Sequence, residues 1–182
     1  TPDELAVVDN EALKTLDIDI RLNNEVGNID GDAHSVMLGN GEQLAYDKLV
    51  LCTGGRARHL PINGLAYERV FTLRTLDDAL RLKTALAAEA GHVLVIGGGW
   101  IGLEVASSAR QMGSEVTLVE YADRLCQRSV TPDISDLLFD LHTSQQVNIM
   151  LETQVLDVTP AEKGLAVSLS NGQTLVCTCI IV

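Results

Sequence analysis

The feature that most restricts the fold of this chain is an internal repeat, in which two segments follow one pattern about 130 residues apart. Three pairs of segments match in the same order: residues 18–26 (IDIRLNNEV) with 147–155 (VNIMLETQV), 35–44 (SVMLGNGEQL) with 166–175 (AVSLSNGQTL), and 47–51 (DKLVL) with 178–182 (TCIIV). The offset is 129 positions at the start (147 − 18) and 131 from the hairpin onward (166 − 35, 178 − 47), which places a two-residue insertion in the loop before the hairpin. Each copy therefore predicts a strand, a loop, a hairpin with an Asn-Gly corner and a final apolar strand.

The second copy has a longer lead-in than the first. It is preceded by an apolar strand at 92–96, a glycine turn, a helix at 100–112 that Gly113 ends, a strand at 115–119, and a helix that opens at Thr131 and Pro132. The first copy has only residues 1–17 before it, and the second stops at Val182 where its own glycine corner should begin. We therefore expect a fragment that contains parts of two nucleotide-binding units, the first without its head and the second without its tail.

The glycine turn is the motif that carries chemistry. The stretch HVLVIGGGWIGLE satisfies GxGxxG at Gly97, Gly99 and Gly102, between an apolar strand and an amphipathic helix. In such a turn the first glycine allows a sharp bend, the second a close approach to a pyrophosphate, and the third close packing of helix and sheet. The N–H groups at the start of the helix then face the phosphates. This context predicts a dinucleotide site, against the alternative of a purely structural turn.

An acidic residue follows at the expected distance. Glu120 ends the next strand, 18 positions after Gly102, where its carboxylate could accept hydrogen bonds from adenosine ribose hydroxyls. Its other interpretation is a solvated strand end. Arg124 and Arg128 lie just beyond, close enough to assist with phosphate or ribose, although such arginines are more often surface charges.

Composition excludes several classes of function. The chain has 182 residues and a formal net charge of −12, and 46% of its residues are hydrophobic, with no run long enough to cross a bilayer and no signal peptide. A cytoplasmic protein is therefore expected. The acidic balance offers no nucleic-acid or membrane surface. Cysteines 52, 126, 177 and 179 form no CxxC pair and are predicted to be buried reduced thiols rather than metal ligands, with Cys177 and Cys179 on one face of a strand.

Three phrases together carry a family resemblance: YDKLVLCTGGRARHLPI, VFTLRTLDDALRLK and VLVIGGGWIGLEVASSARQMGSEVTLVE. The chain resembles the pyridine nucleotide-disulfide oxidoreductase family, in particular the NADH-dependent ferredoxin reductase components of aromatic-ring dioxygenases, and is similar to rubredoxin and putidaredoxin reductases. The resemblance implies an α/β fold of Rossmann-like three-layer domains, each with a parallel sheet and a β-hairpin layer. Residues 1–72 would be the C-terminal part of an incomplete FAD-binding domain, and residues 73–182 an NAD-binding domain truncated at its last strand.

The resemblance also implies site residues. Thr53 and Gly54 match a corner beside FAD, in which Cys52 replaces the family's alanine. The other matched positions lie toward NAD(H): the glycine turn Gly97, Gly98, Gly99, Trp100, Ile101 and Gly102, together with Glu104, Glu120 and Arg128. Trp100 would shield the nicotinamide pocket and Glu104 would lie near nicotinamide and flavin, but packing and an exposed helix face are equally open interpretations. No catalytic nucleophile, acid/base pair or metal site is expected.

The expected function is that of a fragment of a reductase that passes electrons from NADH through FAD to a ferredoxin-type or rubredoxin-type protein. We expect the fragment itself to be inactive and colourless, because the flavin's own glycine turn is not in the sequence. Two alternatives stay open: an isolated NAD(H)-binding module without catalysis, and part of a disulfide reductase.

Overall fold

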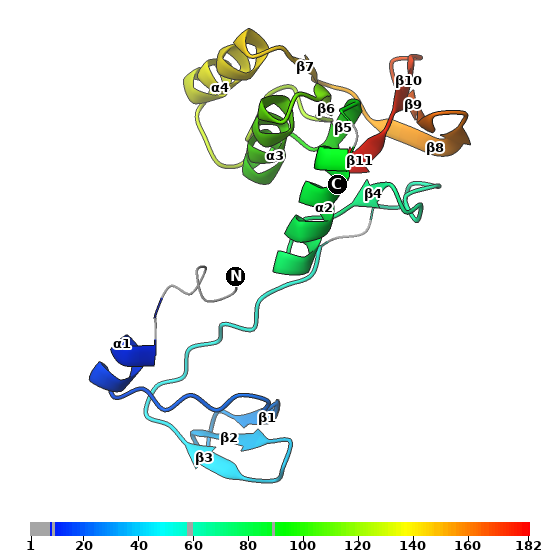
Figure 1. Cartoon of the computed structure of the whole chain (residues 1–182). Helices are drawn as coiled ribbons and strands as arrows, with labels where there is room; N and C mark the ends of the chain where they lie inside the picture. The colour runs from blue at the N-terminus through cyan, green and yellow to red at the C-terminus, as the bar shows by residue number, and fades with distance from the viewer. Residues whose placement is uncertain (1–7, 9, 58–59, 89) are drawn as a thin grey trace. The chain divides into compact units, whose positions relative to one another are not determined.

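The computed structural model describes residues 8, 10–57, 60–88 and 90–182. The chain divides into two compact units, Thr1–Gly54 and Gly55–Val182, each of which is treated by itself (Figure 1). Residues 55–57 and 60–72, which the resemblance assigns to the flavin domain's segment, belong to the second unit. The assignment of 1–72 to FAD and 73–182 to NAD(H) stays a prediction.

The second unit is built on a five-stranded parallel sheet of order β4-β11-β5-β6-β7 (Figure 1). Its strands are β4 (Val70–Phe71), β5 (His92–Ile96), β6 (Glu115–Val119), β7 (Val147–Met150) and β11 (Cys179–Ile181). Its helices are α2 (Leu76–Ala88), α3 (Trp100–Gln111) and α4 (Pro132–Ser144). The predicted strands at 92–96 and 115–119 are confirmed residue for residue.

Alternate side chains of β5 enter two different cores. Val93 and Val95 pack on one face with Leu103 of α3, whereas Leu94 packs on the other face with Val167 of an antiparallel sheet. Buried strands of a parallel sheet need both faces covered, and here helices cover one and the antiparallel sheet covers the other. The predicted three-layer α/β fold is confirmed.

That antiparallel sheet has the order β10-β9-β8, and a second sheet of order β1-β2-β3 lies in the first unit. The six strands are β8 (Val155–Ala161), β9 (Gly164–Leu169), β10 (Thr174–Cys177), β1 (Val26–Asp30), β2 (Ser35–Leu38) and β3 (Gln43–Ala45). Their registers agree at the offsets of the repeat: Val36 pairs with Leu44 as Val167 pairs with Leu175. Each sheet has an irregularity directly after an equivalent valine, Val26 or Val155. The antiparallel sheet of the repeat is therefore one structural unit present twice.

Helix ends follow their local sequence signals. Gly113, with φ +91°, donates its N–H to Arg110 O (2.9 Å) just after α3, as predicted for a glycine that ends a helix. Thr131 is the N-cap of α4 with Pro132 at its first position, also as predicted. α2 begins with a reciprocal pair in which the Asp78 carboxylate accepts from Thr75 N–H (2.9 Å) and Thr75 Oγ1 accepts from Asp78 N–H (3.1 Å). Of the helices in the described ranges, none combines the length and apolar character needed to span a bilayer.

The first unit departs from the prediction at both ends of its repeat. Residues 18–25 and 47–51 form no strand, although the second copy has β7 and β11 at the equivalent positions. A parallel strand is completed only by neighbours, and among the described residues no strand pairs with either segment. A short helix, α1 (Asn10–Thr15), precedes the first segment.

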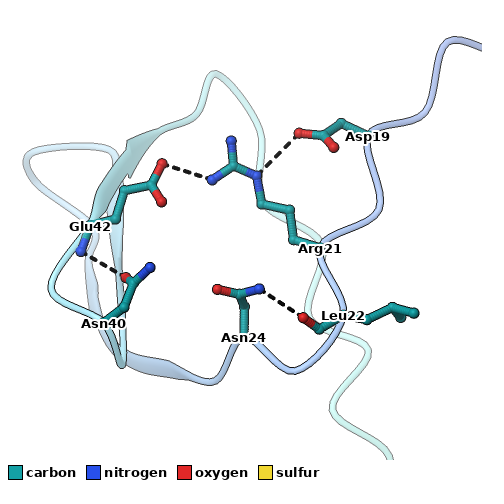
Figure 2. Close-up of polar contacts among 6 residues, drawn as sticks. All are labelled: Asp19, Arg21, Leu22, Asn24, Asn40 and Glu42. Carbon is teal, nitrogen blue, oxygen red and sulfur yellow. Dashed lines mark hydrogen bonds and ion pairs between the residues drawn. The ribbon is translucent and has the colours of Figure 1, made fainter.

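Arg21 holds the first of these segments by polar contacts instead of strand pairing (Figure 2). Its guanidinium contacts Asp19 Oδ2 (3.1 Å) and Glu42 Oε1 (2.8 Å), the latter in the β2–β3 turn. In the same turn Asn40 Oδ1 accepts from Glu42 N–H (2.9 Å). All of these side chains are largely solvated, so the contacts fix a local geometry more than they stabilise the unit.

Two predictions about the cysteines are wrong. Cys52 is exposed, because residues 47–51 before it are not taken into a sheet. Cys177 and Cys179 do not share one strand, since Cys177 ends β10 and Cys179 begins β11. The chain passes between the two sheets at Thr178, whose N–H donates to His92 O (2.7 Å). Cys126, Cys177 and Cys179 are buried free thiols, as predicted.

Candidate functional site

The candidate site is the glycine turn between β5 and α3. Gly97 has φ +111°, which an L side chain rarely adopts, and its N–H donates to Val119 O (2.8 Å). A Cβ at Gly102 would overlap the carbonyl oxygen of Gly97, so glycine is required for the helix to start this close to the strand. These are the first and third positions of the predicted fingerprint, and each has the expected role.

Gly99 is the N-cap of α3 and leaves the helix start open. The first N–H groups of an α-helix have no intrahelical acceptor, and a glycine N-cap brings no side-chain oxygen to them. A Cβ built on Gly99 would meet no described atom within 4 Å. The turn therefore offers free N–H groups, the positive end of a helix dipole and room for an anion, which together fit a dinucleotide pyrophosphate.

Glu120 is brought directly to the glycine turn, as its spacing predicts. Its Oε2 accepts from Gly98 N–H (2.6 Å) and its Oε1 accepts from Ala122 N–H (2.8 Å). Each oxygen keeps a further lone pair, so the carboxylate is held in position and can still accept hydrogen bonds from a ligand. Placed beside the pyrophosphate turn, it is suited to vicinal hydroxyls such as those of a ribose.

The loop after β6 closes around Gly98 from a second side. Cys126 N–H donates to Gly98 O (2.9 Å), and a Cβ on Gly98 would lie 2.6 Å from Leu125 Cδ2. Gly98 occupies a variable position of the fingerprint, but here a side chain on it would have to displace Leu125 and would crowd Glu120. Sequence reasoning missed the part of Leu125 and Cys126; the signal was an adjacent apolar pair within a loop of mainly polar residues.

The remaining arginines and α3 residues near the site differ in their exposure and in their contacts. Trp100 and Ile101 begin α3 with side chains 48% and 58% exposed, and Glu104 is exposed one turn later. Arg128 is exposed on the loop after β6. Arg124 is not free for a ligand, because its guanidinium donates to three acceptors of its own loop and of α4.

Thr53 and Gly54 end the first unit in an exposed irregular segment, where Gly54 has φ +71°. A glycine corner of this kind agrees with the sequence prediction in its backbone conformation. Its role beside a flavin stays a prediction.

Burial controls the chemistry of the three thiols in the second unit. It raises the pKa of the Cys177 thiol to about 12 and that of the Cys179 thiol to about 11. Burial, followed by the charge of Glu120, raises the pKa of Cys126 as well. Because the thiolate is the reactive form, these three cysteines are unsuited to thiol–disulfide chemistry at neutral pH.

Comparisons with known proteins agree with this geometry. The chain is 37% identical over 164 residues to a 3-phenylpropionate/cinnamic acid dioxygenase ferredoxin–NAD(+) reductase component of Photorhabdus laumondii, covering 90% of this chain and 41% of the relative. It is 44% identical over 142 residues to the ferredoxin–NAD(+) reductase component of a p-cumate 2,3-dioxygenase system of Pseudomonas putida, covering 76% and 35%. The chain thus spans less than half the length of these relatives.

A solved ferredoxin reductase structure is also similar to this chain over part of its length. The ferredoxin reductase for the CYP199A2 system of Rhodopseudomonas palustris matches with a TM-score of 0.85 and 32% identity, over all of this chain and 45% of that one. A family model described as pyridine nucleotide-disulphide oxidoreductase matches residues 3–182. With a glycine turn, a held carboxylate and a three-layer fold in place, the chain belongs to the pyridine nucleotide-disulphide oxidoreductase family.

Proposed function

We propose that this chain is part of an NADH-dependent flavoprotein reductase that passes electrons from NADH through FAD to a ferredoxin-type iron–sulfur protein. The observation that carries the proposal is the pairing of an open α3 N-terminus with a carboxylate held on the glycine turn, in a chain similar to ferredoxin–NAD(+) reductase components. Residues 73–182 would hold NAD(H), and residues 1–72 would contribute part of the FAD domain.

The residues of the second unit divide the binding work. N–H groups of Gly99, Trp100 and Ile101 would bind the pyrophosphate, and Glu120 would accept from the adenosine ribose. Trp100 and Glu104, one turn apart on α3, would lie toward the nicotinamide, while Arg128 would lie toward the ribose. When bound, the nicotinamide supplies a hydride, and the flavin converts the electron pair into single electrons for the acceptor.

The proposed partner is a ferredoxin or rubredoxin-type acceptor, and the proposed setting is the cytoplasm, with no nucleic acid and no membrane. The names of the relatives support the ferredoxin. The buried free thiols support a reducing compartment. Those thiols also count against the disulfide-reductase alternative within the part of the chain that the structure describes.

The binding-module alternative applies to the chain by itself. The segments of the first unit that match sheet strands of the second are unpaired, so a flavin site that depends on such a sheet is not formed by the described residues. We expect the purified chain to bind NADH, to carry no flavin and to show no reductase activity. Stoichiometric flavin absorbance in the visible range would contradict this.

Cofactor preference tests the proposal. A carboxylate beside the ribose repels a 2′-phosphate, and after screening we expect NADH to be preferred to NADPH by about 2 kcal/mol, about thirtyfold in affinity. Titrations of wild type, Glu120→Gln and Glu120→Ala with both cofactors measure it. The Gln variant removes the charge but retains an acceptor for Gly98 N–H, so it should relieve NADPH exclusion with less damage to the turn. Equal wild-type affinities would show that Glu120 supports the glycine turn without selecting against a 2′-phosphate.

A further inference from the structure

Two arginines brace opposite edges of the parallel sheet with the same number of hydrogen bonds. Arg124 Nη1 donates to Val130 O (2.9 Å) and Ser135 Oγ (3.0 Å), and its Nη2 donates to Gln127 O (2.9 Å). Arg110 Nε donates to Gln145 O (3.1 Å), its Nη1 to Ser114 O (2.6 Å) and its Nη2 to Gln146 Oε1 (2.7 Å). Both side chains are half-buried, so they should contribute comparably to stability.

The two arginines differ in what they hold. Ser114, Gln145 and Gln146 come just before β6 and β7, at the edge of the sheet away from the glycine turn. The acceptors of Arg124 lie in the loop after β6 and the start of α4, at the same edge as the turn. Only Arg124 therefore braces the edge that carries the candidate site.

The contacts of Arg124 lead to the glycine turn through one buried hydroxyl. Ser135 Oγ, in a side chain 1% exposed, accepts from Arg124 and donates to Leu125 O (2.5 Å). Leu125 and its neighbour Cys126 are the residues that close on Gly98. The loop is also bent at Cys126, whose φ of +48° is unusual for a residue with a side chain and needs support from its surroundings.

We propose that Arg124 is a positioning residue of the dinucleotide site: through Ser135 and the carbonyls of loop 120–130 it fixes Glu120, Gly98 and Cys126 for the cofactor without contacting it. The proposal rests on the proposed NAD(H) site. It explains why a conspicuous arginine beside the site has its guanidinium turned to backbone carbonyls. Arg124 would thus set the shape of the site, because its guanidinium donates to acceptors of the protein and not to the cofactor.

The test compares Arg124→Met with Arg110→Met in the whole chain. Each variant loses three hydrogen bonds, so thermal unfolding should shift by similar amounts. NADH affinity, followed by nucleotide fluorescence, should fall about tenfold in Arg124→Met and stay within about twofold in Arg110→Met. Amide exchange at Gly98 and Cys126 should accelerate in Arg124→Met but not in Arg110→Met. Ser135→Ala, which removes a single hydroxyl, should show part of the loss of NADH affinity and part of the faster amide exchange. It replaces Arg124→Met in the test if that variant does not fold.

Equal NADH affinities in the two arginine variants, or unchanged exchange at Gly98 in Arg124→Met and Ser135→Ala, would overturn the positioning role. Wild type that binds no NADH would overturn the proposed function instead. The exchange measurement needs no cofactor, so it would still decide whether Arg124 holds the loop.

Discussion

Ile29 of the first unit and Val158 of the second occupy equivalent positions in antiparallel sheets of the same register, yet Ile29 is 42% exposed and Val158 is 2% exposed. Beneath Val158 lies the parallel sheet, which contributes Leu94 and Ile180 to the same core cluster. No described strand of the first unit provides such a layer. Equal backbone pairing thus coexists with very different burial.

The antiparallel sheets agree because their geometry is set locally. In each copy a glycine of positive φ turns the hairpin, with Gly41 at +86° and Gly172 at +82°. An asparagine just before it, Asn40 or Asn171, accepts from the N–H two residues later (2.9 and 3.0 Å). Such contacts span only a few residues, so they form with or without a core beneath them.

The flanking segments differ because parallel pairing is not local. Val50 is 80% exposed, whereas Ile181, its equivalent at +131, is 2% exposed between β4 and β5. A parallel strand depends on neighbours that are distant in the sequence. The same apolar pattern therefore yields a buried strand in one copy and an extended exposed segment in the other.

The largest expected effect is at the matched pair Ile180 and Leu49. Ile180 is fully buried in β11, so Ile180→Ala should cost about 4 kcal/mol of unfolding free energy. Leu49 lacks that packing, and Leu49→Ala should cost less than about 1 kcal/mol. Denaturant unfolding followed by circular dichroism measures both. Similar losses would mean that the first unit has a core equivalent to that of the second.

The second prediction concerns the buried thiols, which lie only in the second unit. Cys177 and Cys179 ionise near 9 when unfolded but at about 12 and 11 when folded, so above pH 9 the unfolded state releases protons first. The contribution of these thiols to the free energy of unfolding is therefore fully present below pH 9. The free energy of unfolding should fall by at least about 2 kcal/mol between pH 9 and pH 11. Replacing both with alanine should flatten this fall, while Cys52→Ala, at the exposed thiol, should leave it in place. If the double variant lost stability above pH 9 as wild type does, the loss would not come from Cys177 and Cys179.

Features set by local contacts could be predicted from the sequence, whereas features that depend on distant contacts could not. The strand at 92–96, the glycine turn, the helix stop at Gly113 and the start at Thr131 and Pro132 all rest on signals within a few residues, and all are confirmed. The failures at 18–25 and 47–51 depend on whether partner strands are present. For the site, spacing located Glu120, but the closure on Gly98 depends on a Leu125 side-chain contact and a Cys126 backbone hydrogen bond, which an apolar pair in the sequence does not specify by itself.

The third prediction is that the two hairpin glycines respond alike. Gly41→Ala and Gly172→Ala would each place a side chain at positive φ with open space around it, so each should destabilise its hairpin by about 1 kcal/mol. Hydrogen exchange reports this at Leu38 and Leu169, whose N–H groups donate to Glu42 O and Gln173 O (2.8 and 2.9 Å). A cost confined to one hairpin would show that the turn depends on its surroundings.

The smallest expected effect is at Arg21, whose equivalent in the second copy is Met150 of β7, at +129. Arg21 reaches the β2–β3 turn only through Glu42, and both side chains are well solvated, so Arg21→Met should change the unfolding midpoint less than either glycine substitution does. The hydrogen bond and charge of Arg21 lower the pKa of Glu42, so the small contribution should be present at neutral pH and disappear in acid as Glu42 is protonated. It should also shrink with added salt. Midpoints of wild type and variant, compared at neutral and acid pH and at two salt concentrations, measure this directly. If Arg21→Met instead stabilised the unit, the methionine would have found apolar contacts like those of Met150, and the segment 18–25 would then be closer to a strand than its hydrogen bonds indicate.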